Sequence, residues 1–431
     1  MKRIDTQATQ NPWAWIPTLY FAEGLPYVIA MSVSVIMYKK MGISNADIAL
    51  YTSWLYLPWV IKPLWSPIVD LLRTKRFWIV TMQLVVGAAL ACVALTIHLP
   101  NFFQITIAIL WLMAFSGATH DIAADGFYML ALDEGSQAEF VGIRSVFYRV
   151  AMITGQGVLV IIAGYFETHG GLQFAWSLTF FLVAALFIAL FIYHRFILPH
   201  PVIDAPKEAS ESLGFFSEFF ATFGSFFRKK DILITLAFLL LYRFNESQLI
   251  KLITPFLLDA RDKGGLGLST AEVGVAYGTL GVLGLLFGGI TGGIAIARKG
   301  LKFWLFPMMF IIHVPDLVYM FLSHAQPDNV PLVCALVGME QFTYGFAFTA
   351  YSMYMIKISD GAYKTAHFAI CTGIMAMGMM IPGMFAGRLQ EWLGYRMFFS
   401  SVILSIVPAL LVVSQIRLDP EFGKKKPVAN A

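Results

Sequence analysis

Two aspartates, four residues apart, lie near the end of an otherwise apolar segment. In the stretch SGATHDIAADGFYML, Asp121 and Asp125 follow the run FFQITIAILWLMAF without a turn signal. At this spacing both carboxylates lie on one face of a helix, where they repel each other unless a cation or a proton compensates them. Such a pair can bind and release a proton, or it can form a structural network with Arg144 or Arg149. The pattern leaves both alternatives open.

Further charged residues lie within or near apolar segments. A charged side chain costs about 2.5–3.5 kcal/mol at the centre of a bilayer, so it normally faces a cavity or a partner. Because both signs are present, we expect pairing inside a polar central cavity. The basic members are Lys62, Arg149, Arg243 and Lys251, and the acidic members are Glu23, Asp70, Asp121, Asp125, Glu246, Asp316 and Glu340.

Glu23 and Glu246 lie in two stretches that resemble each other, LYFAEG and LYRFNES. Gly24-Leu25-Pro26 follows Glu23 and predicts an interruption of its helix. A broken helix near the membrane midplane turns free backbone groups toward a cavity. Glu246 can pair with Arg243, three residues earlier, or with Lys251 in a poorer geometry. Both glutamates are therefore candidates for proton or cargo binding, or for salt bridges.

The elements that carry these residues must lie in a lipid bilayer. The chain has 431 residues, 58% hydrophobic and 13% charged, and its mean hydropathy is +0.72. Its apolar residues fall in blocks of about 20, the length of a membrane-spanning helix, and not in short alternating strands. The cysteines lie inside these blocks, which indicates packing and neither a disulfide framework nor a metal site. The sequence predicts an all-α polytopic membrane protein.

Twelve segments are expected to cross the membrane, in two six-helix halves. Roughly twenty basic residues fall on one side and about six on the other, which predicts that both termini are cytoplasmic. The expected divisions are an N-terminal half at 1–195, a cytoplasmic linker at 196–230, a C-terminal half at 231–418 and a cytoplasmic tail at 419–431. The spans lie near 13–38, 46–69, 77–98, 102–126, 141–165, 172–195, 231–257, 270–296, 303–323, 329–355, 365–387 and 396–416.

An internal repeat relates the two halves. MGISNADIALY opens the second span and LGLSTAEVGVAY the eighth, and each has a serine N-cap with an acid three residues later. KRFW and LKFW then open the third and ninth spans. Two six-helix halves joined by a linker are the plan of the major facilitator fold. Within the linker, LGFFSEFFATFGSFFRKK places its phenylalanines on one helical face before a basic cluster, which predicts an amphipathic helix in the cytoplasmic interface.

The segment KPLWSPIVDLLRTKRFW joins the second and third spans. Its Asp70, followed by Arg73 and Arg76, resembles the acid-and-basic signature that major facilitators carry at this position. In that family the signature is a gating latch on the cytoplasmic face. We therefore expect gating, and not cargo binding, from these residues.

Four stretches together resemble the AmpG-type permeases, which belong to the peptide–acetyl-coenzyme A transporter group of the major facilitators. They are GLP, KPLWSPIVD, HDIAADG and FYRVAMITGQG. The resemblance implies proton-driven import of N-acetylglucosamine–anhydro-N-acetylmuramic acid, with or without peptide, across the bacterial inner membrane for peptidoglycan recycling. It implies that Asp121 and Asp125 match the paired acids of the family, and that Tyr148 and Arg149 match its Tyr-Arg pair. His120 departs from the family, which usually has glutamine there.

The charge pattern and the resemblance give one set of expected site residues. Expected alternatives are a siderophore or other organic-anion carrier of the same fold, and a non-transporting membrane sensor. An enzyme is not expected, because no nucleophile–base set or metal-ligand spacing is present. Neither a cofactor nor a nucleic-acid partner is expected, and a monomer is the default. The candidates are Asp121, Asp125, Glu23 and Glu246 for proton coupling, Lys62, Tyr148, Arg149, Arg243, Glu340 and Gln341 for cargo binding, and Asp70, Arg73 and Arg76 for gating.

Overall fold

The computed structural model describes residues 11–201, 204, 221, 223–361 and 364–424. All six expected spans of the first half are helical, and three of them have two parts. A π-helical turn joins α1 to α2, and another joins α7 to α8. The helices are α1 (Ile16–Val28), α2 (Ser34–Lys40), α3 (Asn45–Trp54), α4 (Leu57–Leu72), α5 (Lys75–Thr96), α6 (Phe102–Ala131), α7 (Glu134–Met152), α8 (Val160–Gly170) and α9 (Leu172–Ile197).

The six expected spans of the second half are helical as well. A π-helical turn at Gly274–Gly281 joins α13 to α14, and Gly394 divides α18, with a positive φ of 71°. The helices are α11 (Ile232–Leu241), α12 (Phe244–Leu258), α13 (Thr270–Val273), α14 (Val282–Lys299), α15 (Leu301–Ile311), α16 (Val314–Ala325), α17 (Val330–Ser359), α18 (Lys364–Val402) and α19 (Ile406–Val413).

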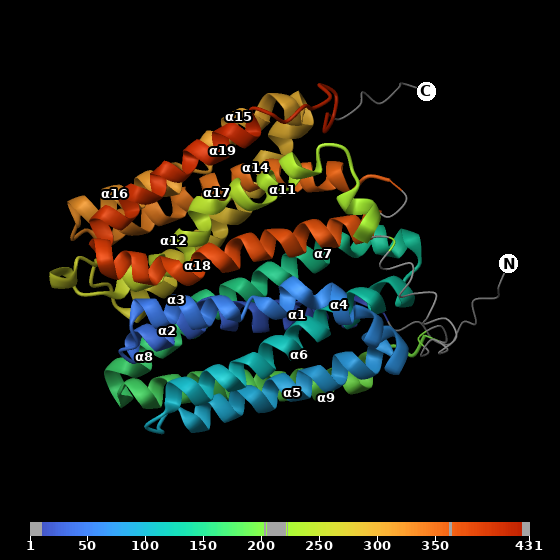
Figure 1. The fold of residues 1–431 in the computed structure, drawn as a ribbon. Coiled ribbons are helices and arrows are strands. Elements are labelled where there is room, and N and C mark those ends of the chain that lie inside the picture. Colours follow the sequence, from blue (N-terminus) through green and yellow to red (C-terminus); the bar gives the residue numbers. More distant parts are fainter. Residues whose placement is uncertain (1–10, 202–203, 205–220, 222, 362–363, 425–431) are drawn as a thin grey trace.

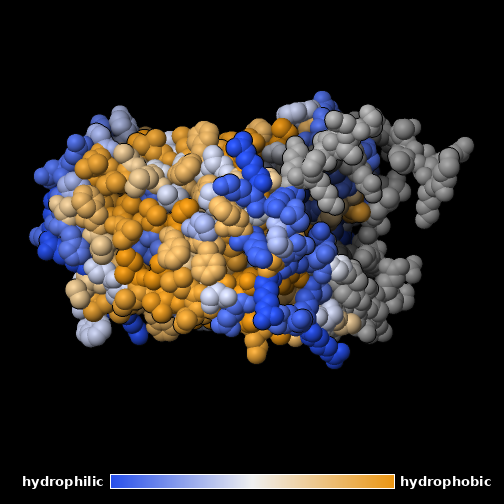
Figure 2. Space-filling model, turned by 90° about the horizontal axis from the view of Figure 1, so that it is seen from above, coloured by the Kyte–Doolittle hydropathy of each residue, from blue (hydrophilic) through white to orange (hydrophobic). Residues whose placement is uncertain are grey.

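The surface and the helix lengths fit a bilayer. Among the described residues, nine helices are long and apolar enough to cross a membrane. The second and seventh expected spans are not among them, and the stretch His367–Val413 carries the eleventh and twelfth together. The helices of each half run alongside one another (Figure 1), and Figure 2 shows an apolar belt between hydrophilic ends. The prediction of an all-α polytopic membrane fold is confirmed.

The predicted serine caps are present in both halves. The Ser44 hydroxyl accepts from the Asp47 amide at 3.0 Å and begins α3. Ser269 forms a full capping box with Glu272, whose carboxylate accepts from the Ser269 amide at 2.8 Å. Each cap satisfies amide donors that the first helical turn leaves free. Equivalent spans of the two halves therefore begin with the same local structure.

The expected interruption of the first span at Gly24-Leu25-Pro26 is wrong. The α1 helix runs through Pro26 to Val28 and widens into the π-helical turn Ile29–Val33. Proline removes only the hydrogen bond to the Ala22 carbonyl oxygen, and membrane helices tolerate such a loss where neighbouring helices pack around them. Gly24 serves close packing instead, because a Cβ there would lie 2.9 Å from the Ala151 Cβ of α7.

The linker joins the two halves with only part of its chain described. Most of the 196–230 linker lies outside the described residues, as does the predicted interfacial helix up to residue 220; of that helix, residues 221 and 223–227 are described and are helical. At its end, Phe226 is buried in the core of the second half, while Phe227 is exposed. The Lys229 ammonium donates to the carbonyl oxygens of Ile358 and Asp360, and burial lowers the pKa of this lysine. The end of the linker is thereby fixed to the end of α17.

The two halves meet through α3 with α18, α8 with α13, and the π-helical turns that follow α7 and α13. Polar contacts between the halves close the end of the molecule where α2 gives way to α3. Lys39 Nζ lies 2.7 Å from Asp259 Oδ1, and Asn45 Nδ2 donates to Gln390 Oε1 at 2.7 Å. We call the Lys39–Asp259 and Asn45–Gln390 contacts the end seal.

Gly278 packs directly against the backbone of the first half, and its replacement by alanine is expected to destabilise the protein. A Cβ at this position would lie 1.9 Å from the carbonyl oxygen of Gln156. Overpacking of this kind costs about 1–3 kcal/mol, so the melting temperature of the detergent-purified protein falls by several degrees. Gly293→Ala is the matched control on α14, because nothing lies within 4 Å of its added Cβ. Equal melting temperatures of the two variants would contradict this prediction.

Candidate functional site

A cavity of about 380 Å³ lies between the two halves, a volume typical of small-molecule sites. Both halves contribute aromatic and charged side chains to its wall. Tyr27, Tyr56 and Trp59 form an aromatic cluster, with the Tyr27 ring 5.4 Å from Trp59 and 6.1 Å from Tyr56 in edge-to-face contacts. All six predicted cargo-binding residues line this wall: Lys62, Tyr148, Arg149, Arg243, Glu340 and Gln341.

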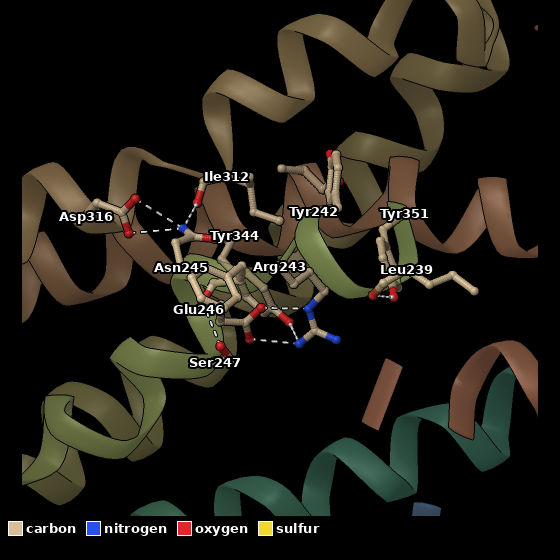
Figure 3. A network of polar contacts seen from close by, with 12 residues as sticks. Leu239, Tyr242, Arg243, Asn245, Glu246, Ser247, Ile312, Asp316, Tyr344 and Tyr351 are labelled. Carbon is tan, nitrogen blue, oxygen red and sulfur yellow. Dashed lines mark hydrogen bonds and ion pairs between the residues drawn. The ribbon is translucent and has the colours of Figure 1, made fainter. Parts of the chain in front are cut away.

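Arg243 and Glu246 form a bidentate ion pair on the cavity wall (Figure 3). Arg243 Nε donates to Glu246 Oε2 at 2.7 Å, and its Nη2 donates to Oε1 at 2.9 Å and to the Tyr344 hydroxyl at 2.6 Å. Arg243 stands in the non-helical break between α11 and α12, which turns its side chain across the first turn of α12. Of the two pairing alternatives, the structure contains this one. Lys251 instead donates to Thr52 Oγ1 of the other half, at 3.1 Å.

A second polar cluster contacts the break between α11 and α12 on the side away from Glu246. The Asn245 amide nitrogen donates to the Ile312 carbonyl oxygen and to Asp316 Oδ1, both at 3.0 Å. Asp316 is fully buried, and its Oδ2 lies 2.7 Å from His313 Nδ1. Figure 3 shows the Asp316 and Glu246 contacts on opposite sides of the first turn of α12. The Asp316 cluster therefore fixes the position from which Arg243 and Glu246 face the cavity.

Glu340 and Gln341 lie side by side on α17. Glu340 Oε1 accepts from the Tyr319 hydroxyl at 2.8 Å and from Gln341 Nε2 at 3.0 Å. Glu340 is 1% exposed, and its donors from Tyr319 and Gln341 are both neutral. A buried carboxyl group in this setting can be held either charged or protonated, which suits cargo or proton binding.

Asp121 and Asp125 share a helix face but have different partners. Asp121 Oδ2 accepts from Trp59 Nε1 at 2.8 Å and lies 3.9 Å from Lys62 Nζ, while its buried Oδ1 has no hydrogen-bond partner among the described residues. Asp125 Oδ1 lies 2.6 Å from Arg144 Nη2, and the Asp125 side chain is 40% exposed. Asp121 is thereby joined to the cavity through Trp59 and Lys62, which line it, and Asp125 forms an ion pair nearer the rim.

Glu23 and Arg149 are the least satisfied charged groups near the cavity. Glu23 Oε2 is buried without a hydrogen-bond partner among the described residues, and it interacts electrostatically with Asp121 and Asp125. Arg149 Nη1 contacts Met152 Sδ at 3.3 Å. Within the described part of the chain, no carboxylate lies within ion-pair distance of Arg149. This guanidinium is available to an anionic group in the cavity.

Of the three gating candidates, Arg73 and Arg76 do not line the cavity. Arg73 is exposed and stacks over the Phe77 ring at 5.5 Å, and the Asp70 side chain lies outside the described residues. Arg76 Nε donates to the Leu198 carbonyl oxygen at 3.3 Å, which ties the start of α5 to the end of α9. Their latch function stays a prediction.

Comparison with known proteins identifies the family. The model of the Major Facilitator Superfamily matches residues 18–362. This chain belongs to the Major Facilitator Superfamily. Proteins of this superfamily and the solved structures most similar to the chain are transporters, which fits a cavity lined by both halves.

Curated relatives of this major facilitator include AmpG-type proteins, as the sequence motifs predicted. The anhydromuropeptide permease of Escherichia coli K12 is 24% identical over 415 residues, covering 94% of this chain and 80% of that protein. A Rickettsia conorii protein named AmpG 4 is also 24% identical, over 410 residues, covering 92% and 94% of the two chains. The recognition of the AmpG type from the four stretches is confirmed.

Solved structures show the same fold at low identity. The nucleoside transporter NupG aligns with a TM-score of 0.67 and 15% identity over 95% of this chain and all of that one. A D-xylose-proton symporter aligns with a TM-score of 0.68 and 11% identity, over 96% of this chain and 99% of its own. These alignments support the major facilitator architecture and carry no information about cargo.

Sequence reasoning missed how several residues of this major facilitator meet. His120 stands beside Asp121 in the chain, but its Nε2 lies 2.9 Å from Gln83 Nε2 on α5, away from the carboxylate. Trp59 is not among the predicted site residues, yet its indole nitrogen donates to Asp121 Oδ2. The two are 62 residues apart, and no local spacing signals the contact.

Proposed function

We propose that this transporter imports N-acetylglucosamine–anhydro-N-acetylmuramic acid, with or without its peptide, by proton symport across the bacterial inner membrane. The observation that carries the proposal is the unpaired Arg149 in a cavity that also presents Lys62 and an aromatic cluster. A guanidinium suits the carboxylate of the muramic acid moiety. Aromatic rings such as Tyr27 and Trp59 suit the apolar faces of sugars. The names of the E. coli and Rickettsia relatives support the same cargo.

We assign proton coupling first to Asp121, which contacts two side chains of the cavity wall, Trp59 and Lys62. Asp121 binds the transported proton, and Asp125, Glu23 and Glu246 are further coupling candidates. The two halves rock about the central site, as in other transporters built from repeated halves. With both termini in the cytoplasm, the end seal faces the periplasm, and the Arg73 and Arg76 region forms the cytoplasmic gate. The protein acts as a monomer in the lipid bilayer, without a cofactor.

The test is uptake of the labelled disaccharide into proteoliposomes that contain the full-length protein. We expect accumulation with an inward proton gradient and equilibration without it. Absence of uptake, with folded and correctly oriented protein, would contradict the proposed cargo. A ferric siderophore run in parallel covers the organic-anion alternative, and gradient-independent accumulation would contradict symport.

A further inference from the structure

Trp59 connects the Asp121 carboxylate to the cavity. Its ring lines the cavity, while its indole nitrogen donates to Asp121 Oδ2 at 2.8 Å. The indole N–H is a donor only, and the other carboxylate oxygen has no hydrogen-bond partner among the described residues. One side chain therefore touches both the space that cargo would occupy and the acid assigned to proton binding.

The position of Trp59 is fixed from several sides. Gly117 lies one helical turn before Asp121 on α6, and a Cβ there would lie 3.3 Å from Trp59 Cζ2. The absence of a side chain at Gly117 lets the indole lie against α6 and reach the carboxylate. On the cavity side, Tyr27 packs edge-to-face against Trp59 and against Tyr56.

The same aromatic cluster reaches the other half of the protein. The Lys251 ammonium of α12 lies 5.0 Å from the centre of the Tyr56 ring and donates to Thr52 Oγ1 at 3.1 Å. Lys251 is 1% exposed, and no carboxylate within the described residues lies at ion-pair distance from it. A continuous series of contacts thus runs from Asp121 through Trp59, Tyr27 and Tyr56 to a cation of the second half.

We propose that Trp59 is the positioning residue through which cargo in the cavity and a proton on Asp121 influence each other. The inference rests on the proposed function of a proton-coupled carrier. An ionised acceptor makes a hydrogen bond about twice as strong as a neutral one, so Asp121 holds the indole firmly only while it is charged. Cargo that moves the indole leaves the carboxylate without its donor, and a proton takes the place of that donor. By linkage, each ligand strengthens the binding of the other by the same factor.

Several charged or titratable groups share the environment of Asp121, and the linkage must act in their presence. Lys62 attracts the carboxylate, whereas Glu23 and Asp125 repel it. Trp59 differs from them because it lines the cavity and also donates a hydrogen bond to the Asp121 carboxylate. From the elements that pack around Asp121, these groups are Glu23 of α1, Lys62 of α4, Lys75 of α5, Asp125 of α6 and Tyr148 of α7.

Trp59→Phe tests the proposal, because it keeps a ring and removes the N–H. In proteoliposomes, exchange of labelled for unlabelled disaccharide requires no net proton movement, whereas accumulation does. We expect W59F to retain exchange within about twofold and to lose gradient-driven accumulation about tenfold, within the usual size of coupling between two sites. The matched control is Trp65→Phe on the same helix, because the Trp65 indole nitrogen is buried without a partner among the described residues. W65F is expected to match wild type in both assays.

A second readout follows the linkage directly. Cargo affinity of the wild type is expected to rise as pH falls. In W59F the factor by which affinity rises is expected to be about tenfold smaller. In a D121N background, W59F should leave cargo affinity unchanged. Wild-type accumulation by W59F, or equal loss of exchange and accumulation, would overturn the role of Trp59. If W59F does not fold, Trp59→Leu also removes the N–H and must give the same separation between exchange and accumulation. Failure of the wild type to transport would instead overturn the proposed function, and this inference with it.

Discussion

Replacement of Asp121 by asparagine is expected to abolish proton-driven accumulation of cargo while the folded protein remains in the membrane. Asparagine keeps the size of the side chain, and its carbonyl oxygen can still accept from Trp59 Nε1, which lies 2.8 Å from the native carboxylate. It cannot bind and release a proton. A gradient of one pH unit supports at most about tenfold accumulation per coupled proton, so accumulation should fall by about that factor, to simple equilibration.

The measurement compares accumulation and exchange of the labelled disaccharide in proteoliposomes that contain the D121N variant. Exchange should persist, because it needs a cavity that can alternate between the two sides and no net proton movement. Asp125→Asn is the comparison on the same helix. Arg144 lies 2.6 Å from Asp125 and already compensates its charge, so a smaller loss of accumulation is expected there. Uphill uptake by D121N at the wild-type level would remove Asp121 from the proton pathway.

The different partners of Asp121 and Asp125 mark the limit of what the sequence could reveal. Their spacing predicts one helix face, and both do lie on α6. Whether each forms an ion pair depends on side chains from other helices, Trp59 and Lys62 for one and Arg144 for the other. The sequence allowed both a proton site and a structural network. In the structure, Asp121 fits the interpretation as a proton site, and Asp125 fits the interpretation as part of a structural network.

Local signals predicted the helices and their starts well, because the physics that produces them is local. Blocks of about 20 apolar residues satisfy backbone hydrogen bonds internally as helices in lipid. The caps at Ser44 and Ser269 use groups within one helical turn. Pro26 misled the prediction because its effect depends on the helices packed around it, and α1 continues through it to Val28.

Contacts between the halves could not be predicted from spacing. Lys39 and Asp259 are 220 residues apart, and the Lys251–Thr52 hydrogen bond also spans the two halves. The repeat indicated that two halves exist and where their spans begin. It does not specify which charged residue of one half meets which residue of the other, because the contacts depend on the packing of the halves. The cavity wall, the end seal and the absence of a carboxylate partner for Arg149 among the described residues all depend on this packing.

Arg149→Gln is expected to weaken cargo binding by about ten- to a hundredfold. The guanidinium lines the cavity and has no carboxylate partner among the described residues. Hydrogen bonds to a charged group contribute about 1.5–3 kcal/mol, which corresponds to this range of affinity. The dissociation constant of the disaccharide is measured on purified protein. Arg144→Gln is the matched control, because Arg144 pairs with Asp125 near the rim and does not line the cavity.

A modified cargo separates a direct contact with Arg149 from a general loss of cavity shape. If Arg149 binds the muramic carboxylate, wild type should bind the free acid ten- to a hundredfold more tightly than its methyl ester, about the same factor that the substitution removes. R149Q should bind the acid and the ester equally, while Arg149→Lys should retain part of the preference, since it keeps the charge and loses the planar fork. A preference for the free acid that persists in R149Q would place the carboxylate elsewhere. Lys62, 3.9 Å from Asp121 Oδ2 on the same wall, would then be the next cation to test, because its ion pair is too long to satisfy it fully.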